Sequence, residues 1–200
     1  MKPQHLFKSG VQRDRSSGQR RRGIATLWLI LLLPAIVTLL VLVVEMGNLW
    51  VAQLELDNSL EAAALAAAQS WDDRPDADGL ALEAAADFAG VNLVAGQPVV
   101  VESDARRERM DMAPPGASSA HAHLQFGVAR WDGSAYEFVA NPSDKEWKAY
   151  PRCVQIQATV PVRGLLQHGF PTLVAGTLRV SRQVVARRLD DGRAEVIWVR

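Results

Sequence analysis

The longest apolar segment of the chain runs from Ile24 to Val44 and contains no charged residue. At about 1.5 Å of rise per residue, a helix of this length spans roughly 31 Å, the thickness of a bilayer's hydrocarbon core. A membrane-spanning helix is therefore predicted here. Two alternatives are weaker. A buried core helix would carry a polar face, and a secretory signal has a shorter apolar region of about 7–15 residues.

A helical pattern continues beyond the apolar segment as far as Gln69. Apolar residues recur at spacings of three and four, at Leu49, Leu56, Leu60, Ala63 and Ala67. The alanine run between residues 62 and 68 favours helix strongly. One continuous helix from about Ile24 to Gln69 is predicted. Because alanine side chains allow close approach, we expect its second half to pack against another helix or another subunit.

A second, shorter helix is predicted from about Ala77 to Asn92, after a break that contains Pro75. Its expected apolar face consists of Leu80, Ala84, Ala85, Phe88 and Val91.

The pattern then changes to the period of two that is typical of strands. Strands are predicted from Val99 onward and over His123–Trp131, Ala135–Val139, Cys153–Val162, Thr177–Arg187 and Arg193–Val199. Asp132-Gly133 predicts a hairpin turn, and residues 106–120 and 164–176 are expected to be connections. The fold class is α+β, with an antiparallel sheet of about five or six strands packed against helices. The expected parts are a basic tail (1–23), a transmembrane helix (24–44), an alanine-rich helical stalk (45–92) and a β-rich domain (93–200).

The zero net charge of the chain conceals a strong asymmetry. Seven basic residues and one acid precede Gly23, whereas residues 45–104 contain twelve acids and a single base, Arg74. Basic residues beside a membrane helix are retained in the cytoplasm. We therefore expect a cytoplasmic N-terminus and an extracytoplasmic domain. Cys153 is the only cysteine, so no intrachain disulfide can form, which fits a bacterial periplasm.

The segment from Arg21 to Gln69 resembles the N-terminal module of TadE/TadG-like proteins of Flp (tight-adherence) pilus systems. The resemblance rests on the basic-glycine start, the central Leu-Pro, the acid followed by glycine, the asparagine and the alanine-rich helix: Arg22-Gly23, Leu33-Pro34, Glu45-Met46-Gly47, Asn58 and residues 61–68. A looser similarity to the β-rich region of TadG-like proteins covers residues 126–132 and the strand that follows.

This resemblance implies a single-pass inner-membrane protein with a periplasmic domain, which assists the assembly or anchoring of a pilus through helix association. Its implied partners are the membrane and other pilin-like subunits or a second copy, with no nucleic acid. The candidate association residues are Glu45, Gly47, Asn58, Ala63 and Ala67. Pilin-like leaders have glutamate at the fifth residue after the cleaved glycine. Trp28 stands there after Gly23, so cleavage is not expected.

The sequence contains no complete catalytic motif. His121 and His123 form an H-x-H pair that a strand would project from one face, a geometry suited to zinc, but the sequence indicates no third ligand nearby. We expect no cofactor, no metal and no enzyme activity. The alternatives are a membrane-anchored periplasmic metal-dependent enzyme that uses this pair, and a ligand-binding module.

Overall fold

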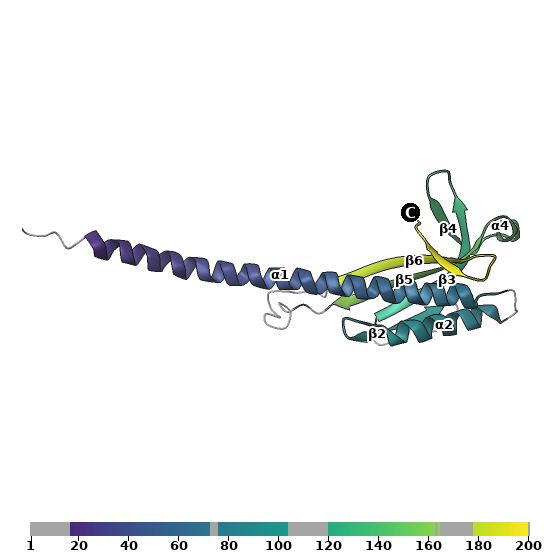
Figure 1. The fold of residues 1–200 in the computed structure, drawn as a ribbon, viewed down its shortest axis with the longest axis horizontal. Coiled ribbons are helices and arrows are strands. Elements are labelled where there is room, and N and C mark those ends of the chain that lie inside the picture. The colour runs from purple at the N-terminus through teal and green to yellow at the C-terminus, as the bar shows by residue number, and fades with distance from the viewer. Residues whose placement is uncertain (1–16, 73–75, 104–119, 163, 165–177, 200) are drawn as a thin grey trace, which may run out of the picture. The chain divides into compact units, whose positions relative to one another are not determined.

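A computed structural model of the protein describes residues 17–72, 76–103, 120–162, 164 and 178–199 (Figure 1). The predicted connections at 106–120 and 164–176 lie almost entirely outside the described residues. The chain divides into two compact units, Met1–Val44 and Glu45–Arg200. The predicted stalk (45–92) and β-rich domain (93–200) therefore form one unit.

The first unit contains the N-terminal part of helix α1 (Ser17–Ser70), which has Pro34 in its interior. The Thr38 hydroxyl donates a hydrogen bond to the Pro34 carbonyl (2.8 Å), as expected for a hydroxyl in an apolar helix. In the described part of the chain, α1 is the one helix long and apolar enough to cross a membrane. Its most apolar window has a mean hydropathy of 3.0 and no buried residue.

The second unit contains the rest of α1, two further helices and a seven-stranded sheet. The helices are α2 (Ala77–Val91) and the short α4 (Asp144–Ala149). The strands are β1 (Leu93–Val94), β2 (Gln97–Ser103), β3 (Ala120–Trp131), β4 (Tyr136–Ala140), β5 (Arg152–Val162), β6 (Leu178–Arg188) and β7 (Ala194–Ile197). The α+β class is confirmed, and each predicted strand has a counterpart.

The sheet has the order β1-β2-β3-β5-β6-β7, and β4 pairs with the end of β3. It is mixed rather than wholly antiparallel, because β2 and β3 are parallel, with Val99 opposite Ala120 and Ser103 opposite Leu124. Parallel neighbours need a connection of about a dozen residues or more. The sixteen residues between Ser103 and Ala120 meet that requirement, whereas the other pairings are antiparallel.

The main hydrophobic core lies between the helices and one face of the sheet. Alternate residues of the strands, such as Val154 and Ile156 of β5, pack with the buried side of α1 and with α2. The residues of α1 in this core are Ala52, Leu56, Leu60, Ala63, Ala64, Ala67 and Ala68. The second half of α1 is thus part of the core of its own domain.

The buried face of α2 differs from the predicted one. Ala77, Ala81, Ala85 and Ala89 are buried at a strict spacing of four, whereas Phe88 and Val91 are exposed. A stripe of methyl groups brings a helix closer to its neighbours than phenylalanine would. The alanines were therefore the better signal for the buried face, although the other face is more hydrophobic.

The opposite face of the sheet carries a smaller core at one end. Four residues are buried there against β4 and the segment after β7: Ala129, Cys153, Val185 and Ile197. An isolated β-bridge joins Tyr136 of β4 to Val199. Gly127 permits this arrangement. A Cβ at this position would lie 2.3 Å from the Val139 carbonyl oxygen.

Candidate functional site

The second half of α1 has one buried face and one exposed face, and the exposed face is apolar near the predicted span. Met46, Trp50 and Leu54 follow one another at a spacing of four, and Val51 lies beside them. Each is about half exposed or more, with Met46 at 71% and Trp50 at 67%. We call Met46, Gly47, Trp50, Val51, Leu54 and Asn58 the exposed α1 face. Two of the five predicted association residues, Gly47 and Asn58, belong to it.

Gly47 lies in the open part of this face. A Cβ added at this position would meet nothing within 4 Å, apart from the helix's own neighbouring backbone. The domain itself therefore does not require glycine here for packing. A glycine on an exposed helix face would let a second helix approach the backbone closely.

Ala63 and Ala67 occupy the other face of α1. Both are fully buried in the main core of this chain. Their small side chains allow α1 to pack closely within its own domain, and they have no surface left for a second subunit. Sequence periodicity identified their common face correctly, but it could not indicate whether that face meets this chain or another.

Glu45 stands at the first position of the second unit and is buried, with 8% of its surface exposed. Its carboxylate lies against Gly164: a Cβ there would be 1.5 Å from Oε1 and 2.6 Å from Cδ. Glu45 also takes part in a polar interaction. The carboxylate that was a candidate partner contact thus lies within its own domain, beside a glycine that sequence reasoning did not connect with it.

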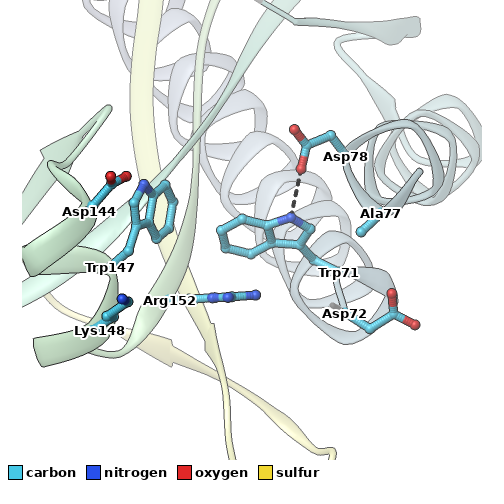
Figure 2. Close-up of a pocket in the computed structure, with 8 residues that line it drawn as sticks. All are labelled: Trp71, Asp72, Ala77, Asp78, Asp144, Trp147, Lys148 and Arg152. Carbon is cyan, nitrogen blue, oxygen red and sulfur yellow. Dashed lines mark hydrogen bonds between the residues drawn. The ribbon is translucent and has the colours of Figure 1, made fainter. Parts of the chain in front are cut away.

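A pocket of about 440 Å³ lies at the other end of α1 (Figure 2). Its lining residues are Trp71, Asp72, Ala77, Asp78, Asp144, Trp147, Lys148 and Arg152. The Trp71 indole N–H donates to Asp78 Oδ1 (2.8 Å), as the dashed line in Figure 2 shows. The guanidinium carbon of Arg152 lies 5.9 Å from the Trp71 ring centroid and 6.0 Å from that of Trp147.

These side chains fasten the end of α1 to the domain. Trp71 also packs against Phe126 of β3, with ring centroids 4.8 Å apart, and Arg188 donates to the Trp71 carbonyl (3.1 Å). A carbonyl at a helix C-terminus lacks an intrahelical partner, so this bond caps α1. The Arg152 guanidinium already occupies the cation–π position over both indole rings. We therefore interpret the cluster as a structural contact that anchors the end of α1. Sequence reasoning missed it because its members come from four distant segments.

His121 and His123 lie on the polar face of β3, as the H-x-H pattern predicts. His121 Nδ1 is 3.3 Å from Glu102 Oε1. Among the residues that the structure describes, no group of three histidine, cysteine, aspartate or glutamate side chains could hold a metal ion.

The geometry therefore defines a class of protein: a helix with a candidate membrane span that continues into the core of a small α+β domain and presents an apolar, glycine-containing face beyond the span. Residues 23–70 match the family model described as putative Flp pilus-assembly TadE/G-like. This match confirms the TadE/TadG-like resemblance over about a quarter of the chain. No curated protein and no solved structure matches.

Proposed function

We propose that this protein is a non-enzymatic, membrane-anchored component that assists the assembly or anchoring of a Flp-type pilus by helix association. The observation that carries the proposal is the exposed α1 face. Its apolar residues reach Leu54, and a helix from Ile24 to Leu54 is roughly 46 Å long, about 16 Å more than the hydrocarbon core. Lipid tails cannot cover the part of this face that extends beyond the hydrocarbon core. A partner helix would cover that part instead.

The partner that fits is another apolar helix anchored in the same membrane, such as that of a pilin-like subunit or of a second copy. Gly47 would allow close approach of the two backbones, and the Asn58 amide would supply a polar contact at the outer end of the face. The basic residues before the span favour a cytoplasmic N-terminus, with the α+β domain in the periplasm of a bacterial cell.

A bulky residue at position 47 tests this mechanism without disturbing the domain. Gly47→Leu should leave the thermal stability of the full chain in detergent unchanged or higher, because no neighbour lies within 4 Å. It should nevertheless reduce co-purification of pilin-like subunits and the number of surface pili. Gly90→Leu is the matched control, because Gly90 is also helical and open but lies on α2. Normal piliation with Gly47→Leu would remove this face from the mechanism.

The absence of catalysis is part of the proposal and has its own test. The purified full chain should contain no stoichiometric zinc. A metal content near one ion per chain that falls on changing His121 or His123 to alanine would favour the enzyme alternative instead.

A further inference from the structure

The edge of the sheet at β6 is paired with a strand along only part of its length. β7 pairs with β6 over Val185–Arg188 and no further. Among the described residues, Leu178–Val184 of β6 are paired with a strand on one side only, that of β5. In an antiparallel arrangement, roughly every second residue turns its backbone N–H and C=O toward a given edge. This part of β6 therefore offers donors and acceptors to an added strand.

A groove of about 440 Å³ lies at the place where β7 leaves this edge. It is lined by Asp57 and Glu61 of α1, by Arg182–Val185 of β6 and by Val196–Val199 at the end of the chain. Trp198 borders the groove and is 85% exposed. A tryptophan this exposed beside buried valines offers a large apolar surface that no described residue covers.

The charges along the groove are unbalanced. Asp57 forms an ion pair with Arg182, with 3.0 Å between Oδ1 and Nε, so this acid is paired within the chain. Glu61 lies one helical turn further along the same wall and has no hydrogen bond or ion pair among the described residues. Within the described part of the chain, the groove thus combines a strand edge without a partner strand, an apolar wall and one unpaired carboxylate.

We propose that this groove accepts an extended segment of a partner protein, which pairs with β6 through its backbone. An added strand would lie in line with β7 and continue the sheet, the mode of recognition known as β-augmentation. The segment would place an apolar side chain against Trp198 and Val184, and a lysine or arginine beside Glu61. The groove adjoins the outer end of the exposed α1 face, because Asn58 lies between Asp57 and Glu61 in α1. Its recognition chemistry is different, and the proposal does not depend on the pilus assignment.

A designed peptide provides a direct test with the full chain in detergent micelles. The probe is a seven-residue peptide of alternating valine and threonine that carries one lysine. The expected result is saturable binding, measured by fluorescence anisotropy, with slower amide hydrogen exchange in Leu178–Val184. The same peptide with N-methylated alternate amides keeps its side chains but loses half of its donors, so it should bind at least about tenfold more weakly. Equal binding of the two peptides, or unchanged exchange in β6, would overturn the proposal.

Two substitutions test the contributions of Trp198 and Glu61 to peptide binding separately. Trp198→Ala should weaken peptide binding by about tenfold, whereas Trp50→Ala, an exposed tryptophan on the other surface, should not change it. Glu61→Lys should weaken binding of the lysine peptide and improve binding of a peptide with glutamate in its place. Glu83→Lys on α2 is the control for net charge. Retained affinity in both Trp198→Ala and Glu61→Lys would show that the groove is only a solvated sheet edge.

Discussion

Replacing Gly164 with alanine should destabilise the second unit through Glu45. The new Cβ would lie 1.5 Å from Oε1, whereas an ordinary contact begins near 3.4 Å. The carboxylate must therefore move by roughly 2 Å. The end of a glutamate side chain is flexible, so the main cost is the disturbance of a polar group that is buried and already has an interaction partner. Overpacking of a filled site costs about 1–3 kcal/mol. We expect a loss of about 2 kcal/mol in the free energy of unfolding.

A double-mutant cycle isolates this contact. Urea unfolding of the full chain in detergent, followed by near-ultraviolet circular dichroism, would give the four free energies. Gly164→Ala should cost about 2 kcal/mol in the native background but less than about 0.5 kcal/mol when Glu45 is already alanine, because the clash is then absent. Gly90→Ala is the control, and its open helical site predicts a gain of up to about 1 kcal/mol. An equal cost in both backgrounds would refute the role of Glu45.

Three further predictions concern the sheet. Gly127→Ala should cost about 3 kcal/mol in the same unfolding assay, because its Cβ would meet the backbone carbonyl of Val139; a cost below about 1 kcal/mol would contradict this packing. Burial raises the pKa of the Cys153 thiol to about 12, so a maleimide should leave the folded chain unlabelled at pH 8 and label it only after unfolding; rapid labelling of the folded chain would show an accessible thiolate. Hydrogen bonds from the Ala135 and Ser134 amides lower the pKa of Asp132 from 3.8. Because the pKa of Asp132 is lower in the folded chain, its hydrogen bonds stabilise the folded turn at any pH above the unfolded pKa. This stabilisation is lost as the pH falls through the folded pKa. NMR titration should therefore place the midpoint of Asp132 below 3.8.

Local patterns were sufficient to predict most elements of secondary structure. The uncharged segment before Glu45 and the alanine run after it each favour helix, and together they predicted α1. The alternation from Cys153 to Val162 predicted β5, which is Arg152–Val162. The Asp132-Gly133 turn lies where it was expected, and Gly133 has a φ of +101° that favours glycine. Each of these signals is contained within about ten to twenty consecutive residues.

Features that depend on distant segments could not be predicted in this way. Nothing near Glu45 indicates that Gly164 will lie against it. The parallel pairing of β2 with β3 depends on the route of a long connection. The buried face of α2 is the one whose small alanine side chains allow close packing, not the more hydrophobic one. The short helix α4 was missed, although Ser143 and Glu146 form a capping box at its start, with the Ser143 amide 2.8 Å from the glutamate carboxylate.

The position of α1 in the main core has a consequence for the order of events during synthesis. Residues 45–70 leave the ribosome early, yet their partners are made late: Asp57 pairs with Arg182, 125 positions further on, and the Trp71 carbonyl waits for Arg188. The buried face of α1 therefore stays without its sheet until nearly the whole chain has been synthesised. For the same reason, a recombinant fragment that begins at the first strand would lack one wall of its core. A fragment meant to retain that wall should begin at Glu45.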